Sequence, residues 1–153
     1  MKLEDALIWR QELKKSGKKL VITNGCFDIL HRGHVEYLAG ARACGDALLV
    51  LINSDASVRS IKGPTRPVND ELARITVLEA LRCVDAAVVF TSSRCDRELD
   101  VLEPDIYVKG GDYTVEKLDK TERAVLEKHG TEIKFIPFVP GFSTTSIIEK
   151  MRS

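Results

Sequence analysis

The sequence has 153 residues, in which 23 lysine and arginine residues balance 23 aspartate and glutamate residues, and 44% of the residues are hydrophobic. This length and composition suit a single globular domain, residues 1–153, with one core. The zero net charge gives no general attraction to nucleic acid or to a membrane surface. No stretch approaches the roughly 18 apolar residues of a membrane helix, and the charged start is not a signal peptide, so we expect a cytoplasmic protein.

The chain begins with an amphipathic helical pattern over residues 1–17. Its apolar residues recur at helical spacing among charged ones: Leu3, Leu7, Ile8 and Leu13. We expect this helix to pack on the remaining core, residues 18–153, or to contribute to a homodimer, because periodicity alone does not separate these two cases. The first strand is expected over residues 19–23.

The stretch from residue 20 to 45 carries the most informative pattern. An apolar run ends in a glycine turn at Asn24-Gly25, and two histidines, His31 and His34, follow before apolar residues at helical spacing. This order predicts a strand, a loop and a helix, with the histidines in the loop and the first helical turn. Because the unpaired N–H groups and the dipole of a helix start favour an anion, the stretch predicts a phosphate site.

A second apolar run of strand length covers residues 46–52, and such runs separated by helices indicate a buried parallel sheet. Residues 53–55 can cap a short helix. We expect a loop over residues 60–69, because glycine and proline interrupt it. The loop carries two cations, Lys62 and Arg66.

The middle of the chain continues the alternation of helices and strands. Asn69 or Asp70 caps a helix that is expected to end near Val84-Asp85. Its apolar face is formed by Leu72, Ile75, Leu78 and Leu81. A strand over residues 86–90, a helix over 94–102 and a strand over 105–108 are expected next.

The last of these strands runs directly into a glycine-rich loop, Lys109-Gly110-Gly111-Asp112-Tyr113. Paired glycines at the carboxyl end of a parallel strand let the backbone approach a ligand closely. A plain turn could use the same glycines. We expect this loop and the histidine loop to share one pocket, because both follow strands of the same parallel sheet.

The C-terminal part predicts a charged helical region over residues 114–130, a strand over 132–138 and a last helix. Ser143-Thr144-Thr145 at the start of this helix can cap it or hold phosphate. The whole alternation predicts a Rossmann-like, doubly wound α/β fold with a parallel sheet of about five strands. The patterns G-x-G-x-x-G and G-x-x-x-x-G-K-[ST] are absent, which argues against a dinucleotide dehydrogenase and a P-loop kinase.

The cysteines are scattered without a C-x-x-C pair, at Cys26, Cys44, Cys83 and Cys95. A chain of this length needs no disulfides, so free thiols are favoured. Cys26 could join His31 and His34 at a zinc ion, but no fourth ligand has suitable spacing. We therefore expect no metal ion held by the protein alone.

The motifs, taken in order, resemble those of a known superfamily. Gly25-Cys26-Phe27-Asp28 followed by His31-Arg32-Gly33-His34 is similar to the HxGH signature of the cytidylyltransferase-like nucleotidyltransferases. Further matching motifs are Asn53-Ser54-Asp55, Lys62-Gly63, Arg66-Pro67-Val68-Asn69, Val108-Lys109-Gly110-Gly111-Asp112-Tyr113 and Gly141-Phe142-Ser143-Thr144-Thr145-Ser146-Ile147-Ile148. The set spans Val21 to Met151 and is similar to the adenylyltransferase part of bacterial bifunctional heptose kinase/adenylyltransferases.

The resemblance implies transfer of AMP from ATP to a sugar 1-phosphate, D-glycero-β-D-manno-heptose 1-phosphate, for ADP-heptose and lipopolysaccharide synthesis. It implies catalytic roles for His31, His34 and Lys62. The implied nucleotide contacts are Gly25, Cys26, Phe27, Gly33, Lys109, Gly110, Asp112, Ser143, Thr144 and Thr145. The candidate contacts to the sugar phosphate are Asp28, Arg66 and Tyr113.

The implied reaction needs no strong base, because a phosphate monoester is already nucleophilic near neutral pH and can attack the α-phosphorus in line. The two histidines would donate hydrogen bonds to the phosphates, Lys62 would help pyrophosphate leave, and the Ser-Thr-Thr turn would hold the β- and γ-phosphates. Mg²⁺ is implied by ATP and is expected to bind mainly through its phosphates, since no carboxylate cluster forms a cage.

Three alternatives stay open. The first is a cytidylyltransferase acting on glycerol 3-phosphate or another polyol phosphate, although such enzymes often carry an arginine where this chain has Pro140-Gly141-Phe142. The second is a flavin-directed adenylyltransferase. The third is a regulatory module that binds a nucleotide without turnover. A kinase half is absent, so we expect a stand-alone adenylyltransferase or an excised domain.

Overall fold

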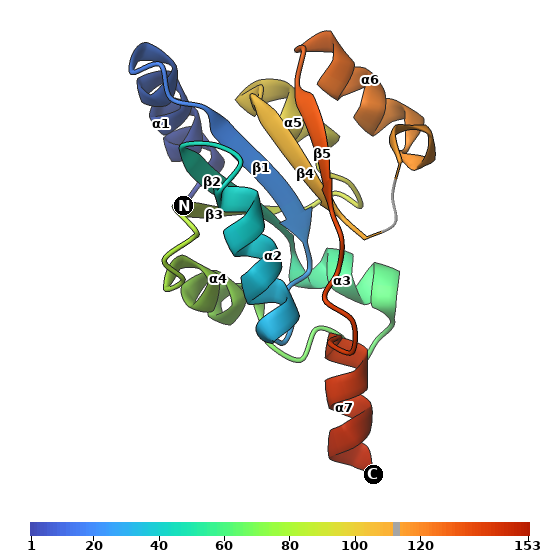
Figure 1. Ribbon diagram of the computed structural model, residues 1–153. Coiled ribbons are helices and arrows are strands. Elements are labelled where there is room, and N and C mark those ends of the chain that lie inside the picture. Colours follow the sequence, from blue (N-terminus) through green and yellow to red (C-terminus); the bar gives the residue numbers. More distant parts are fainter. Residues whose placement is uncertain (112–113) are drawn as a thin grey trace.

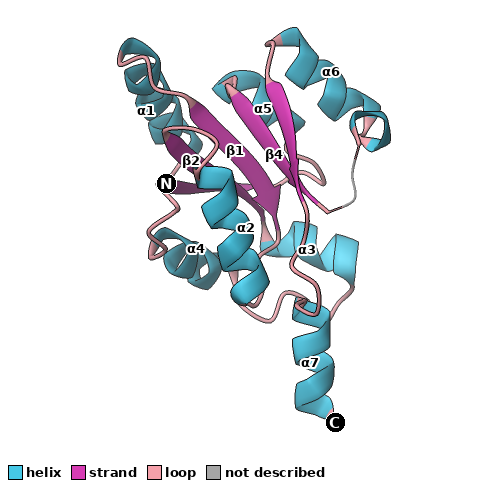
Figure 2. Ribbon diagram, viewed as in Figure 1, coloured by secondary structure: helices cyan, strands magenta, loops and turns pink. Residues whose placement is uncertain are grey.

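The computed structural model describes residues 1–111 and 114–153, which form a parallel sheet with helices on both faces (Figures 1 and 2). The strands are β1 (Leu20–Gly25), β2 (Ala47–Asn53), β3 (Ala86–Phe90), β4 (Ile106–Gly110) and β5 (Glu132–Ile136). Their order across the sheet is β3-β2-β1-β4-β5, and all neighbours are parallel. The predicted doubly wound α/β fold is confirmed.

The helices are α1 (Leu3–Lys15), α2 (Arg32–Arg42), α3 (Asp55–Lys62), α4 (Glu71–Glu79), α5 (Asp96–Leu102), α6 (Lys120–Lys128) and α7 (Thr144–Arg152), with a 3₁₀ turn at Val115–Lys117. Helices α2 and α4 cover one face of the sheet, and α1, α5 and α6 cover the other (Figure 1). Helix α7 projects away from the sheet and carries the C-terminus (Figure 1). Among the described helices, none is long and apolar enough to cross a membrane.

Successive side chains along a strand point to opposite faces of the sheet. The strands therefore contribute to two hydrophobic clusters, one on each face of the sheet. Leu20 and Ile22 of β1 pack with α1, α5 and α6, whereas Val21 packs with α2 and α4. Every residue of β2 is buried, as expected for an inner strand of a parallel sheet covered on both faces.

Helix α1 packs onto the face of the sheet that α5 and α6 also cover, and a buried arginine anchors it there. Arg10 donates hydrogen bonds to the carbonyl oxygens of Leu102 (3.0 Å) and Glu103 (2.6 Å) and pairs with Asp105 at 2.9 Å. The predicted apolar stripe was partly wrong, because Ile8 is 64% exposed while Ala6, Arg10 and Leu13 face the core.

Several predicted ends of elements differ from the structure. The loop predicted from residue 60 begins only after Lys62, because α3 continues to that residue and Gly63, with a φ of 103°, follows it. Helix α4 ends at Glu79 rather than near Val84-Asp85.

Two further differences lie on α4 and β5. Leu72, predicted for the apolar face of α4, is 72% exposed, since the buried residues of this helix are Arg74 and Leu78. Strand β5 ends at Ile136, so Phe138 lies in the loop that follows.

The chain moves outward from β1 through β2 to β3, and then returns to the other side of β1 to form β4 and β5. The connections after β1 and β4 therefore leave the sheet in opposite directions. In open α/β sheets such a reversal leaves a crevice at the carboxyl ends of the two strands, where ligands bind.

Candidate active site

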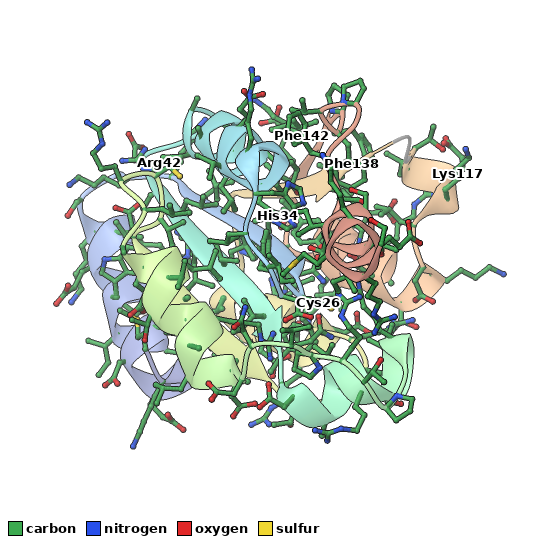
Figure 3. The ribbon with its side chains drawn as sticks, turned by 90° about the horizontal axis from the view of Figure 1, so that it is seen from below. Cys26, His34, Arg42, Lys117, Phe138 and Phe142 are labelled. Carbon is green, nitrogen blue, oxygen red and sulfur yellow. The ribbon has the colours of Figure 1, made fainter. Side chains whose placement is uncertain are left out.

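A cavity of about 670 Å³ lies at this crevice. Its lining includes every described residue that the sequence predicted for the site: Gly25, Cys26, Phe27, Asp28, His31, Gly33, His34, Lys62, Arg66, Lys109, Gly110, Ser143, Thr144 and Thr145. Figure 3 looks along α7 toward the cavity, with Cys26, His34, Phe138 and Phe142 around the helix. Asp112 and Tyr113 lie outside the described residues.

The two histidines stand together at the start of α2. His31 is the N-cap residue and His34 lies in the first turn, and their rings stack with centroids 3.8 Å apart. Gly33 makes this arrangement possible, because a Cβ there would lie 2.9 Å from the His31 ring and 3.1 Å from Phe142. The motif glycine is thus required by close packing within the cavity wall.

Both histidines have a lowered pKa. Burial, helped by the nearby His31 and Lys62, lowers the pKa of His34 to about 4, against the opposing effect of a backbone hydrogen bond at Ile29. Burial also lowers the pKa of His31. His34 is therefore neutral at physiological pH. The Nδ1 atom of each ring is buried without a hydrogen-bond partner among the described residues, as expected where a ligand or water completes the site.

The segment before the histidines folds tightly onto β1. Phe27 has a φ of 48°, and its ring lies where a Cβ on Gly25 would come within 2.8 Å of it. Glycine is therefore needed at position 25. Cys26 donates a hydrogen bond from Sγ to Asn53 at 3.7 Å, and burial raises the pKa of its thiol, which keeps it protonated at neutral pH.

Asp28 joins the histidine loop to the segment after α3. Its carboxylate, 1% exposed, accepts hydrogen bonds from the N–H groups of Val68 and Asn69 at 2.9 Å and from Arg66 Nε at 2.7 Å. Burial raises the pKa of Asp28, but these hydrogen bonds and the Arg66 charge outweigh it and hold the pKa below its usual value. Both carboxylate oxygens of Asp28 therefore hold residues 66–69 in place.

Lys62 and Arg66 bring positive charge to the cavity. Arg66 is oriented by Asp28 through Nε, while its Nη2 atom is buried without a partner among the described residues. An oriented guanidinium with an unused donor is suited to bind a phosphate or carboxylate.

Arg74 lies off the predicted apolar face of α4, so the sequence left open whether it faces solvent or the site; in the structure it connects three segments. Its side chain is fully buried and donates to the carbonyl oxygens of Cys26 (2.8 Å) and Asn69 (3.1 Å) and to Asp55 (2.7 Å). It thereby holds the Cys26 backbone against α3 and α4.

The start of α7 lies against the histidine loop. Ser143 caps the helix by accepting a hydrogen bond from the Ser146 N–H at 3.0 Å, and Thr144 donates from Oγ1 to the carbonyl oxygen of Ile29 at 3.2 Å. The N-termini of α2 and α7 therefore meet at one cavity. Two helix N-termini with exposed N–H and hydroxyl groups favour an anion between them.

The end of β4 forms another part of the wall. The ring of Phe138 fills the space over Gly110 and Gly111, where added Cβ atoms would lie 2.6 Å and 2.7 Å from it. The Lys109 ammonium lies 3.2 Å from the carboxylate of Glu122 on α6. The sequence did not predict Glu122 for the site. Glu122 lies four residues before the buried Leu126 and therefore on the same, inward face of α6. This spacing is the sequence signal that could have predicted it.

The described residues contain no group of three His, Cys, Asp or Glu side chains that could hold a metal ion. Cys26, His31 and His34 thus form no such group, and all four cysteines are free. The cavity instead gathers the two neutral histidines, two helix N-termini and the cations Lys62, Arg66, Arg94 and Lys109, of which the last three pair with carboxylates. Such a donor set suits a polyphosphate.

A Rossmann-like sheet with an HxGH histidine pair at its carboxyl edge is the arrangement expected from the motif resemblance to the nucleotidyltransferases. Comparison with known families agrees, because the cytidylyltransferase-like family matches residues 22–150. The chain belongs to the cytidylyltransferase-like family.

Relatives and solved structures extend this result. The bifunctional protein HldE of Geotalea uraniireducens is 51% identical over 92% of this chain, and that of Hahella chejuensis is 45% identical over 99%. The chain spans only 28% and 31% of these two proteins, less than a third of their length.

Two solved structures are similar in fold. The lipopolysaccharide core biosynthesis protein from Thermoplasma volcanium is 30% identical with a TM-score of 0.65, and the match covers 80% of this chain and 98% of that one. Pantoate-beta-alanine ligase from Francisella tularensis shares the fold with a TM-score of 0.59 at 14% identity, over 99% of this chain and 75% of that one.

Proposed function

We propose that this domain transfers AMP from ATP to D-glycero-β-D-manno-heptose 1-phosphate, releasing pyrophosphate and forming ADP-heptose. One observation carries the proposal. The His31/His34 pair at the start of α2 and Ser143 at the start of α7 line the same cavity. The choice of a heptose is supported by the motif resemblance, by the identity to HldE proteins and by the likeness to a lipopolysaccharide core biosynthesis protein.

In the proposed reaction, an oxygen of the sugar phosphate attacks the α-phosphorus of ATP, and the bond to the bridging oxygen of pyrophosphate breaks. The protein contributes position and charge stabilisation. His31 and His34 donate hydrogen bonds to the phosphates, and Lys62 stabilises the leaving pyrophosphate. Ser143, Thr144 and Thr145 hold the β- and γ-phosphates at the start of α7.

The low pKa values of the histidines suit these roles. Neutral rings tolerate burial before ATP arrives, and the negative triphosphate then favours their protonated form, because an opposite charge nearby raises the pKa of a histidine. The histidines thus become stronger donors when the substrate is in place.

The remaining predicted residues are assigned around this centre. Gly25, Cys26, Phe27, Gly33 and the backbone of Lys109 and Gly110 form the proposed nucleotide contacts. Arg66 binds the phosphate of the sugar through its unused Nη2 donor, and Asp28 acts by orienting Arg66. Asp112 and Tyr113 remain predicted contacts.

Mg²⁺ enters the proposed reaction with ATP. It binds through substrate phosphates and water, which needs few protein ligands. Asp28 is no candidate ligand in this arrangement, because both of its oxygens accept hydrogen bonds from the protein.

The test is pyrophosphate release in the presence of Mg²⁺, with ATP or CTP offered separately, each with heptose 1-phosphate or glycerol 3-phosphate. We expect turnover with ATP and heptose 1-phosphate alone. Turnover with CTP and glycerol 3-phosphate would instead assign the chain to the cytidylyltransferase alternative. Nucleotide binding without turnover of any pair would assign it to a regulatory role.

A further inference from the structure

The cavity has two walls of different chemistry, and β1 lies between them. Thr23 Oγ1 lies 2.7 Å from the Tyr37 hydroxyl on α2, the helix that carries the histidines. The next residue, Asn24, faces the other side of the sheet and donates from Nδ2 to Cys95 Sγ at 3.3 Å, beside α5. The histidines therefore stand on an α2 wall, opposite an α5–α6 wall for which the proposed reaction has so far assigned no side-chain ligand.

The α5–α6 wall carries a polar cluster of Asn24, Tyr107, Lys109 and Glu122. The Tyr107 hydroxyl donates to Glu122 Oε1 at 2.5 Å and lies 2.9 Å from Asn24 Oδ1. Lys109 Nζ lies 3.2 Å from the same Glu122 oxygen. Asn24, Lys109 and Glu122 line the cavity, whereas Tyr107 is fully buried behind them.

This cluster is poorly explained by stability alone. Removing a carboxylate and an ammonium from water costs free energy that their attraction often fails to recover, and apolar residues of similar size often serve stability as well. Glu122 is only 9% exposed, yet its Oε2 atom accepts no hydrogen bond from the described residues. Among the described residues this acceptor is therefore unused, and Glu122 itself lines the cavity.

The charge of the cluster indicates what it can bind. Lys109 and Glu122 cancel each other, and Arg94 at the same wall pairs with Asp96 and Asp119. The wall therefore does not attract a phosphate as the α2 wall does. A carboxylate oxygen, an amide and an ammonium group instead match hydroxyl groups, which both donate and accept hydrogen bonds. A ligand with several hydroxyl groups fits this wall better than an anion or an apolar group.

We propose that Asn24, Lys109 and Glu122 bind the hydroxyl groups of the sugar phosphate that accepts AMP, with Tyr107 as a positioning residue that holds the Glu122 carboxylate. This inference rests on the proposed function, because it requires the triphosphate to occupy the α2 wall. It adds to that function a site that selects an acceptor with several hydroxyl groups, with Glu122 of α6 at its centre.

The first test compares Glu122→Gln with Glu127→Gln in the full chain. Glu127 is a matched control, since it lies on the same helix and pairs with Arg123 at the surface. For Glu122→Gln we expect KM for the sugar 1-phosphate to rise at least tenfold, with KM for ATP within twofold of the wild type. For Glu127→Gln we expect no change in either KM.

The second test removes hydroxyl groups from the ligand rather than changing the protein. Singly deoxygenated sugar 1-phosphates are compared with the parent sugar on the wild type and on Glu122→Gln. We expect at least one analogue to lose tenfold in kcat/KM on the wild type and to lose little on the variant, because a buried polar group discriminates against a ligand that leaves it unpaired. Tyr107→Phe should raise the acceptor KM less than Glu122→Gln does.

Three outcomes would overturn the inference. They are a rise in KM for ATP instead of the acceptor, a loss of thermal stability with both KM values unchanged, and equal discrimination among the analogues by both proteins. Absence of wild-type turnover with ATP and heptose 1-phosphate would contradict the proposed function alone. Calorimetric binding of the same sugar phosphates to wild type and Glu122→Gln then decides the subsite, and equal affinities reject it.

Discussion

In the proposed reaction His34 acts on a bound phosphate, and its geometry supports this role, because its ring packs between Phe27 and His31 and leaves Nδ1 without a protein partner among the described residues. We predict that His34→Ala lowers kcat about 100-fold, the usual effect of removing one donor to developing charge. Pyrophosphate release measures this loss. His129→Ala is the control, since His129 pairs with Asp100 at the end of α6 and should retain full activity. A loss below threefold for His34→Ala would contradict its assigned role.

Asp28 predicts a pH dependence of stability. Its pKa is held below the usual value in the folded protein, so on acidification the unfolded state binds the proton first. The stability that Asp28 contributes is therefore complete above the usual pKa of an aspartate and is lost as the pH falls through the lower folded value. We predict that Asp28→Asn costs about 2 kcal/mol at pH 7 through its charge-assisted hydrogen bonds.

Urea unfolding of the wild type and Asp28→Asn at pH 7 and at pH 3 checks this prediction. The difference between the two proteins should shrink at pH 3. A difference that stays the same at both values would show that the loop is held by packing rather than by the carboxylate.

The sequence predicted which residues of the α2 wall lie together, because these residues are close along the chain and form a recognisable motif. It missed Glu122 and left the orientation of Arg74 open for a different reason. Both are charged residues on helices, where a charge is usually exposed, and apart from Asn69 beside Arg74 the partners named above lie 13 to 48 positions away. Such long-range pairs depend on the packing of whole elements, which local patterns do not report.

At the scale of elements, Arg74 makes α4 part of the site although none of its residues lines the cavity. We predict that Arg74→Met destabilises the protein by about 3 kcal/mol, because it leaves Asp55 and two carbonyl oxygens without their buried partner. Denaturant unfolding measures the effect. Arg82→Met, the same change at an exposed position, is expected to fall within about 0.5 kcal/mol of the wild type.

Equal stabilities for Arg74→Met and Arg82→Met would contradict the role given to Arg74. A destabilised Arg74→Met protein should also show a higher KM for ATP, because the Cys26 backbone beside the histidines loses its support.

The predicted elements were confirmed in type and order, whereas their ends were less well predicted. Lys62 illustrates the cause, since Gly63 and Pro64 suggested a loop from residue 60 while the Ser54 cap and the packing of Val58 extend α3 to Lys62. Leu72 illustrates the opposite error, in which an apolar residue at helical spacing remains exposed because Arg74 takes the buried position. Periodicity predicts which face a helix can bury, and tertiary contacts select the face that it does bury.

At the scale of the whole molecule, α7 differs from the other described helices. It projects beyond the sheet and contains no buried residue, yet its first turn forms part of the cavity (Figure 1). Its first residue, Thr144, is tied to the histidine loop through the carbonyl oxygen of Ile29. The helix therefore contributes little to the core and, in the proposed function, much to binding the triphosphate.

This separation predicts the effect of removing α7. Deletion of residues 143–153 should leave the unfolding temperature of the free protein nearly unchanged, because the deleted helix buries no residue in the core. A ligand at 100 times its Kd stabilises a folded protein by about 2.7 kcal/mol, and we expect the wild type to show such a shift with MgATP. The deletion should abolish this shift, since the hydroxyl and N–H groups that we propose to hold the β- and γ-phosphates are gone. Deletion of residues 151–153 alone keeps the Ser143 cap and should retain the shift. If the long deletion retained it too, the triphosphate would not bind at α7.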